Sequence, residues 1–226
     1  MRLLLIRHGQ TPANVIGALD TAAPGPGLTA LGEEQAAAVP HALRHETIEA
    51  VYASILIRTQ LTSRPLTDAL GRPRATVLPG IHEIEAGDLE DRTDRPAVQK
   101  YVETAWAWGV GDLDPRMPGG SDGHEFFARY DADIRAIAEA HTGGTAVAFS
   151  HGAAIRVWCA GRAGNLPPNY AAVSSLDNTG VVILEGDPDK GWDVESWAGQ
   201  PVGGMELHDP RADDVTGESV EPHPAD

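Results

Sequence analysis

Two histidines stand in matching positions of the sequence, each after a short apolar run and before a glycine. The first lies in Arg7-His8-Gly9-Gln10-Thr11, after the apolar residues 3–6, and the second lies in Ser150-His151-Gly152, after residues 145–149. A neutral imidazole is a competent nucleophile toward phosphorus, and a neighbouring arginine offers a planar fork of donors suited to phosphate oxygens. The first segment therefore indicates phosphate chemistry, although a structural histidine beside a surface arginine would give the same short pattern.

Three further residues could complete this chemistry. Arg58 stands near the start of a predicted helix over 55–70, where backbone amides also favour anions. Glu83 offers a carboxylate that can carry a proton, and Glu85 and Asp88 compete with it for this role. Two histidines, two arginines and one glutamate would suffice for phosphoryl transfer without a metal ion.

The elements that must position these residues alternate along the chain. Apolar runs predict strands at 3–6, 50–53, 75–78, 145–149, 180–184 and 192–197, and helical patterns cover 29–44, 55–70, 97–108, 122–141 and 153–160. This alternation predicts an α/β fold, a three-layer α/β/α sandwich with a mainly parallel central sheet. Because ligands bind outside the carboxyl ends of such strands, His8 and His151 could share one crevice despite their separation in the sequence.

Composition divides the chain into one domain and a tail. We expect residues 1–202 to form a single α/β domain, with an acidic, Gly- and Pro-rich insertion at about 80–123 that caps the active site. Residues 12–28 are expected to form a long loop, and Pro40 is expected to bend its helix or end it early.

The last residues differ in composition from the rest. Residues 203–226 contain seven acidic residues, one arginine and few large apolar side chains, so they cannot bury much apolar area. We expect an acidic C-terminal tail that is mobile or lies on the surface.

The charge of the whole chain limits its partners. It has 17 Lys and Arg against 33 Asp and Glu, a net charge of −16, which argues against a nucleic-acid or anionic-membrane partner. Phosphate chemistry would therefore need a locally basic pocket.

Cysteine content and hydropathy indicate the compartment. The single Cys159 excludes an intrachain disulfide and fits a reducing environment. The apolar run at 3–6 is too short for the core of a signal peptide, and no run is long enough to span a membrane. A cytoplasmic protein is expected.

Taken in order, these motifs resemble the histidine phosphatase superfamily, the group that includes the cofactor-dependent phosphoglycerate mutases. The resemblance rests on Arg7-His8-Gly9-Gln10-Thr11 with Asn14, Leu28-Thr29 with Gly32, Gln35 and Ala36, Tyr52-Ala53-Ser54 with Arg58, Ile81 with Glu83 and Gly87, Pro118-Gly119-Gly120 with Arg129, Phe149-Ser150-His151-Gly152 with Ile155-Arg156, and Asn178. These motifs span residues 2–198.

The resemblance implies a two-step mechanism. His8 would attack phosphorus and form a phosphohistidine, while Arg7, Arg58 and His151 would stabilise charge on the phosphoryl oxygens. Glu83 would protonate the leaving oxygen and then activate the water that hydrolyses the intermediate.

The resemblance also implies the remaining features of the site. Gln10, Thr11, Asn14 and Gly152 would bind a small phosphorylated metabolite, and neither a metal nor an organic cofactor would be required. A homodimer would be in keeping with relatives, among which dimers are common.

Mutase activity is the main alternative to hydrolysis. Mutases of the family usually carry Trp-Asn after the opening signature and adjacent arginines in the insertion, whereas this chain has Ala13-Asn14 and scattered Arg92, Arg95 and Arg116. These departures favour a phosphatase. A non-catalytic module that binds phosphorylated ligands is a further alternative, but none of the five catalytic residues is missing.

Overall fold

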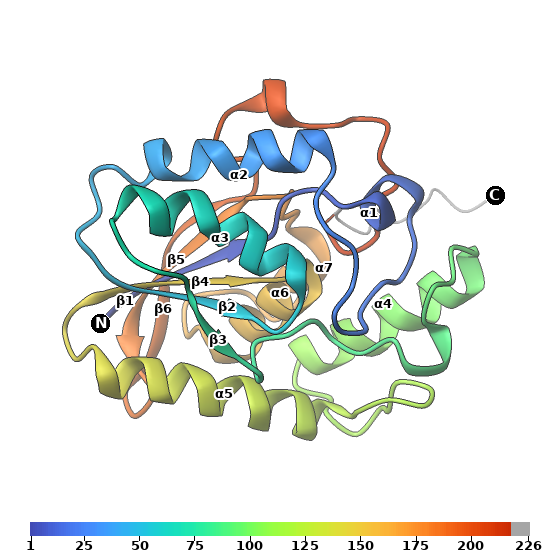
Figure 1. Cartoon of the computed structure of the whole chain (residues 1–226). Coiled ribbons are helices and arrows are strands. Elements are labelled where there is room, and N and C mark those ends of the chain that lie inside the picture. Colours follow the sequence, from blue (N-terminus) through green and yellow to red (C-terminus); the bar gives the residue numbers. More distant parts are fainter. Residues whose placement is uncertain (218–226) are drawn as a thin grey trace.

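The computed structural model describes residues 1–217, which form a six-stranded sheet with helices on both faces (Figure 1). The strands are β1 (Arg2–Arg7), β2 (Ile48–Ser54), β3 (Thr76–Leu78), β4 (Thr145–Ser150), β5 (Val181–Asp187) and β6 (Gly191–Ala198). The α-helices are α1 (Pro12–Ile16), α2 (Ala30–Ala42), α3 (Ile57–Ala69), α4 (Arg95–Gly109), α5 (Gly123–Ala140), α6 (Gly152–Arg162) and α7 (Tyr170–Val173). Two short 3-10 helices are η1 (Gly87–Leu89) and η2 (Met205–Leu207).

The sheet is mainly parallel, as predicted. Its strand order is β3-β2-β4-β1-β5-β6, and the first four strands pair in parallel. β5 is antiparallel to both β1 and β6. The parallel strands β1 and β4 lie side by side at the centre, so their carboxyl ends meet at one edge of the sheet.

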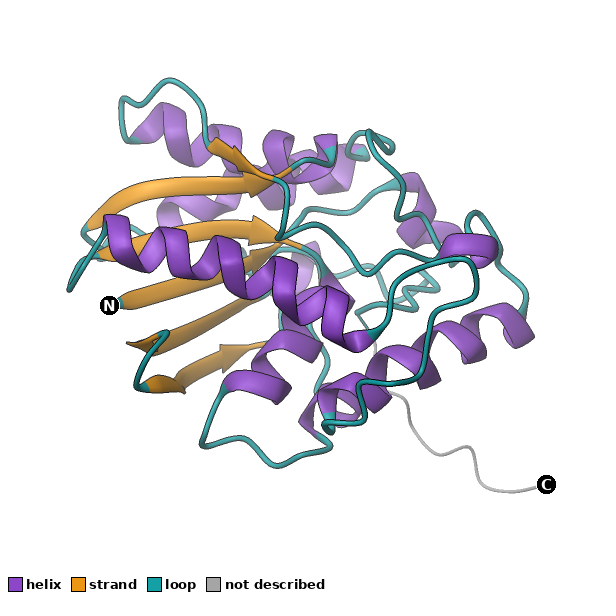
Figure 2. Ribbon diagram, turned by 90° about the horizontal axis from the view of Figure 1, so that it is seen from below, coloured by secondary structure: helices purple, strands orange, loops and turns teal. Residues whose placement is uncertain are grey.

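The central strand β1 explains the two covering layers. Leu3 and Leu5 belong to one apolar core, whereas Leu4 and Ile6 belong to another, because successive side chains point to opposite faces. The first core includes side chains of α4, α5 and α6, and the second includes side chains of α2 and α3. The three-layer α/β/α prediction is confirmed, and Figure 2 shows the strands behind the long helix α5.

Pro40 does not end its helix early, contrary to that part of the prediction, and Pro65 does not end its helix either. α2 continues past Pro40 to Ala42, and α3 continues past Pro65 to Ala69. A proline removes only one backbone hydrogen bond, and the turn after Pro65 buries Leu66 against the second core.

The region at 80–123 contains η1 and α4 and shares the first core. Trp106 and Trp108 are both buried, with Trp108 stacked on Phe126 of α5. The expected loop at 12–28 contains the short helix α1, which the sequence analysis did not predict. Thr11 and Asn14 form a capping box at the start of α1.

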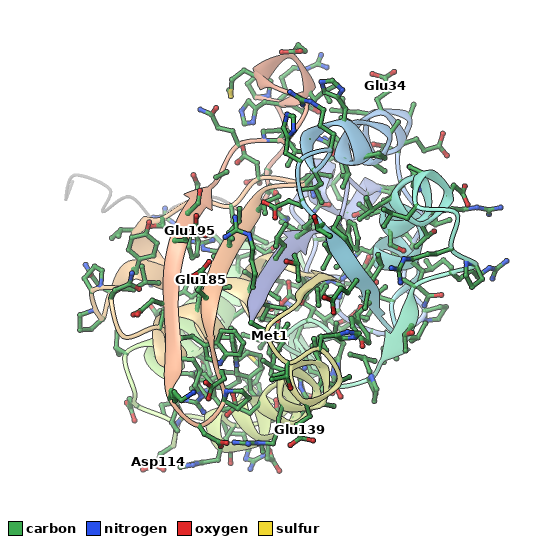
Figure 3. The ribbon with its side chains drawn as sticks, turned by 90° about the vertical axis from the view of Figure 1, so that its left-hand side faces the viewer. Met1, Glu34, Asp114, Glu139, Glu185 and Glu195 are labelled. Carbon is green, nitrogen blue, oxygen red and sulfur yellow. The ribbon has the colours of Figure 1, made fainter. Side chains whose placement is uncertain are left out.

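The amino end of β1 lies among carboxylates. Arg2 pairs with Glu46 and also contacts Glu185 and Glu195, which Figure 3 shows on β5 and β6 near Met1. His8 follows the other end of β1, so this acidic group and the candidate site lie at opposite ends of the strand.

The acidic tail is described as far as Gly217, and residues 218–226 lie outside the described residues. Its described part lies against the domain, where the Leu207 carbonyl accepts a hydrogen bond from Gln35 Nε2 at 2.8 Å. No helix within residues 1–217 is both long and apolar enough to cross a membrane.

Candidate active site

Parallel pairing of β1 with β4 brings the two histidines together. Arg7 is in register with Ser150, so His8 and His151 follow paired residues. Their ring centroids are 5.2 Å apart, and both side chains are buried. The predicted common crevice therefore has a direct structural cause.

His8 is held in one tautomer. Its Nδ1 lies 2.8 Å from the carbonyl oxygen of Gly9, which can only accept, so Nδ1 carries the proton and Nε2 of the neutral ring keeps its lone pair. Burial lowers the pKa of His8 well below its usual value, and the charges of Arg58 and Arg7 lower it further. The imidazole is thus neutral and has the form that a nucleophile requires.

His151 is oriented by a serine. Its Nε2 lies 2.7 Å from Ser54 Oγ, while its buried Nδ1 has no hydrogen-bond partner within residues 1–217. Burial, and then the charge of Arg58, lowers the pKa of His151 well below its usual value. When Ser54 donates to Nε2, the proton of the neutral ring is on Nδ1, which can then donate to a ligand.

Arg58 lies in the first turn of α3 and is held by the loop between α1 and α2. Its Nη2 donates to the carbonyl oxygen of Asp20 at 2.9 Å, and its Nη1 lies 3.7 Å from the Asp20 carboxylate. Burial is the main cause of the lowered pKa of Arg58. Its Nε and Nη1 form no hydrogen bond to the described part of the chain, so both can donate to an anion.

Arg7 is fully buried and has one donor to spare. Its Nη1 donates to the Leu176 carbonyl and to the Asp214 carboxylate, and its Nη2 donates to Asp214 and to Thr216 Oγ1. Burial opposes the charge of the guanidinium, but the contacts with Asp214 outweigh it and raise the pKa. Only Nε lacks a partner among residues 1–217.

Glu83 is the buried carboxylate of the site. It accepts hydrogen bonds from the backbone amides of Ile84 at 2.9 Å, Ala154 at 2.8 Å and Ala153 at 3.3 Å. The last two belong to the first turn of α6, whose N-terminus favours a negative charge. Its competitor Glu85 is half exposed and lies 3.2 Å from His82 Nε2.

His8, Arg58 and Glu83 line one small cavity of about 20 Å³, whereas Arg7 and His151 are not among its lining residues. The cavity is lined by His8, Thr11, Ala13, Asn14, Ala18, Leu19, Asp20, Thr21, Arg58, Glu83 and Thr216. That volume admits little more than one water molecule. Through Thr21 the cavity adjoins another of about 360 Å³.

Two of the four predicted binding residues line the catalytic cavity, and the other two do not. Thr11 and Asn14 line the cavity with His8. Gly152 begins α6, and a Cβ there would lie 3.0 Å from Arg7 Nε. Gln10 does not line the cavity, because its side chain bonds Thr29 and Asp209 and borders a separate hollow.

The sequence analysis did not predict Asp20, Ser54, Asp214 or Thr216 as parts of the site. Ser54 was noted only as part of a motif. Asp214 is 207 positions from Arg7, and its contact leaves no local pattern in the sequence. The acidic composition of the tail was the only signal, and it suggested a segment unconnected with the site.

The comparison with protein families decides the family. The model of the histidine phosphatase superfamily, branch 1, matches residues 3–200. The chain belongs to this superfamily. The resemblance inferred from the motifs is therefore confirmed.

Two similar proteins have sequences at least 36% identical to this chain over the aligned residues. A PE-PGRS family protein of Mycobacterium tuberculosis is 40% identical over 217 residues, covering 89% of this chain and 37% of that protein. Adenosylcobalamin/alpha-ribazole phosphatase of Salmonella typhimurium is 36% identical over 129 residues, covering 57% of this chain and 62% of that protein. The chain thus spans less than two thirds of either relative.

A solved structure shows the same fold. The alpha-ribazole phosphatase from Shigella flexneri is 28% identical with a TM-score of 0.69, covering 88% of this chain and 96% of that one.

Proposed function

We propose that this histidine phosphatase superfamily protein hydrolyses small phosphate monoesters through a phosphohistidine on His8. The observation that carries the proposal is the state of His8, a neutral imidazole with Nδ1 bonded to Gly9. Buried arginines with spare donors flank it. The phosphatase names of the Salmonella and Shigella relatives support the same activity.

The first step transfers the phosphoryl group to the protein. Nε2 of His8 forms a bond to phosphorus while the ester P–O bond breaks. The unpartnered Nε atoms of Arg7 and Arg58, with His151 Nδ1, donate to the phosphoryl oxygens. Glu83, which lines the cavity with His8, gives its proton to the leaving oxygen.

The second step releases phosphate. Glu83 then accepts a proton from water, whose oxygen attacks phosphorus as the P–N bond breaks. The three backbone amides that bond its carboxylate hold it in the cavity wall beside His8. Because the arginines neutralise the phosphoryl charge, we propose that the reaction is independent of metal ions.

The adjoining cavity supports hydrolysis over mutase activity. It is lined by the carboxylates Glu85 and Glu90, which would repel the carboxylate of a phosphoglycerate. His82 also lines it, with its Nε2 3.2 Å from Glu85. Arg92 instead pairs with Asp94. The other two arginines that could bind such a carboxylate do not line this cavity either. Arg116 pairs with Asp122 and Glu125, and Arg95 is exposed.

We further propose a small phosphorylated metabolite as the substrate, with neither nucleic acid nor membrane as a partner, in keeping with the net charge of −16. A cytoplasmic location and a homodimer are also proposed. Light scattering on the purified chain tests the dimer, and a monomer mass would refute it.

Hydrolysis of p-nitrophenyl phosphate in the presence of EDTA tests the proposed activity. We expect turnover to persist with EDTA and to fall at least about a thousandfold in His8→Ala, because the nucleophile is lost. His124→Ala, which alters an exposed side chain, serves as the matched control. Loss of turnover with EDTA would refute metal independence, and undiminished turnover in His8→Ala would refute the mechanism.

A panel of sugar phosphates, phosphoglycerates and nucleotides, read by phosphate release, would identify the substrate class. Primer-dependent isomerisation of 3-phosphoglycerate without phosphate release would instead show the mutase activity.

A further inference from the structure

The acidic tail contacts the predicted phosphate-binding arginine. Asp214 accepts hydrogen bonds from Arg7 Nη1 at 2.5 Å and from Nη2 at 2.7 Å, a bidentate pair. Asn14 Nδ2 donates to the same carboxylate at 3.1 Å. Asp214 therefore contacts both a buried cation of the site and a residue of its wall.

Asp214 does not line the catalytic cavity. It borders a separate hollow with Gln10 and Asp177, whereas Thr216 lines the catalytic cavity with His8. Both Nη groups of Arg7 are thus engaged, by Asp214 and, at Nη2, also by the cavity-lining Thr216. Its Nε is the donor left for a ligand.

The segment from Asp214 to Gly217 is fixed at several points. Thr216 accepts from Arg7 Nη2 through its hydroxyl at 3.0 Å and from Arg156 Nη1 through its carbonyl at 2.9 Å. The Gly217 carbonyl accepts from the Leu176 amide at 2.8 Å. These contacts come from three parts of the domain, so the segment is built into the site.

Two glycines allow this close approach. A Cβ on Gly152 would lie 2.6 Å from the Thr216 carbonyl oxygen, and one on Gly217 would collide with Arg7 Nη1. Any side chain at either position would therefore displace the segment or the guanidinium.

We propose that Asp214 is a positioning residue of the phosphoryl-binding site, which fixes the Arg7 fork so that Nε points at the phosphoryl group, and that Thr216 completes the wall of this site. The inference rests on the proposed phosphatase function. A buried guanidinium needs a partner for its charge, and a bidentate carboxylate also fixes the plane of the fork. Asp214 supplies both without entering the cavity.

A competing role for Asp214 would change activity in the opposite direction. A carboxylate that blocked the phosphate site would act as an inhibitor, and its removal would strengthen phosphate binding. Positioning predicts weaker binding and slower turnover, because an unrestrained Arg7 would lose its alignment.

The test compares Asp214→Asn with Asp213→Asn in the full chain. Both substitutions remove one negative charge at adjacent positions, but the Asp213 side chain is exposed and forms no bond to Arg7. Orthovanadate, a phosphate analogue, is titrated calorimetrically, and kcat is measured with p-nitrophenyl phosphate. We expect D214N to weaken vanadate binding and to lower kcat by about 10-fold to 100-fold each, and D213N to change neither.

A double-mutant comparison identifies the route of the effect. In an Arg7→Gln background, D214N should weaken vanadate binding less than about twofold further, because Asp214 acts through Arg7. A full D214N effect in that background would overturn the positioning role, since a merely structural role would not depend on Arg7.

The outcomes separate this inference from the proposed function. Tighter vanadate binding in D214N would overturn the positioning role, and so would equal vanadate affinity and kcat in D214N and D213N. Either result would leave the proposed function standing if wild-type protein hydrolyses the ester and H8A does not. Absence of turnover in wild-type protein would refute the proposed function instead. Should D214N not fold, Thr216→Val still tests the segment: vanadate binding should weaken about fivefold, and an unchanged value would refute the role of Thr216.

Discussion

At the scale of single residues, the site depends on which nitrogen of each histidine is engaged. Gly9 fixes His8 through Nδ1, and Ser54 contacts His151 through Nε2. The two rings therefore have different free nitrogens, Nε2 for attack and Nδ1 for donation. The same His-Gly motif thus follows two strands but gives two roles, because His8 bonds the Gly9 carbonyl and His151 bonds the Ser54 hydroxyl.

The Ser54 contact gives a test at this scale. Ser54→Ala leaves His151 without the partner that sets its tautomer, so we expect kcat to fall about fivefold with little change in KM. Ser63→Ala on α3 is the matched control, because the Ser63 hydroxyl bonds only the backbone carbonyl of Gln60. Equal kcat values in the two variants would show that Ser54 does not orient His151.

At the scale of elements, the apolar runs predicted the central strands because a strand buried on both faces needs apolar side chains at every position. The same reasoning predicted that His8 and His151 lie at one edge of the sheet. The helix α1 was missed because it has five residues in a Gly- and Pro-rich segment. Its Thr11–Asn14 capping box was the available signal.

The start of α6 gives a test at this scale. Gly152→Ala would place a methyl group 2.6 Å from the Thr216 carbonyl and 3.0 Å from Arg7 Nε, so we expect kcat/KM to fall at least about tenfold. Gly164→Ala is the control, since its nearest neighbour would be 3.6 Å away. An unchanged kcat/KM in G152A, with G164A also unchanged, would show that the close approach is not needed.

At the scale of the whole molecule, part of the negative charge belongs to the site, because one carboxylate of the acidic tail pairs with a buried arginine there. The acidic tail suggested a segment apart from the site, yet its Asp214 pairs with Arg7. Composition could indicate low apolar burial, but not an ion pair between residues 207 positions apart, because such a pair leaves no periodicity or spacing. The tail contributes an anion where the domain buries a cation.

Burial of two neutral histidines predicts how stability depends on pH. His8 and His151 have folded-state pKa values well below 6.5, so the unfolded chain binds more protons as the pH falls below that value. The free energy of unfolding therefore does not depend on these two histidines above about pH 6.5. Below that pH it falls by up to about 1.4 kcal/mol per histidine per pH unit.

Urea unfolding at pH 7.5 and 5.5, without phosphate, measures this loss. His8→Gln should lose less stability between the two pH values than wild type, and His124→Gln should behave as wild type. An equal loss in wild type and H8Q would contradict the neutral, buried state of His8.

The central claim is that His8 carries the phosphoryl group, and trapping the intermediate tests it most directly. Protein mixed with p-nitrophenyl phosphate is quenched in alkali, which preserves phosphohistidine, and peptides are mapped by mass spectrometry. We predict one phosphoryl group on the peptide that contains His8, present in H124A and absent in H8A. A phosphoryl group on another residue, or turnover with no trapped phosphoryl group under single-turnover conditions, would contradict the mechanism.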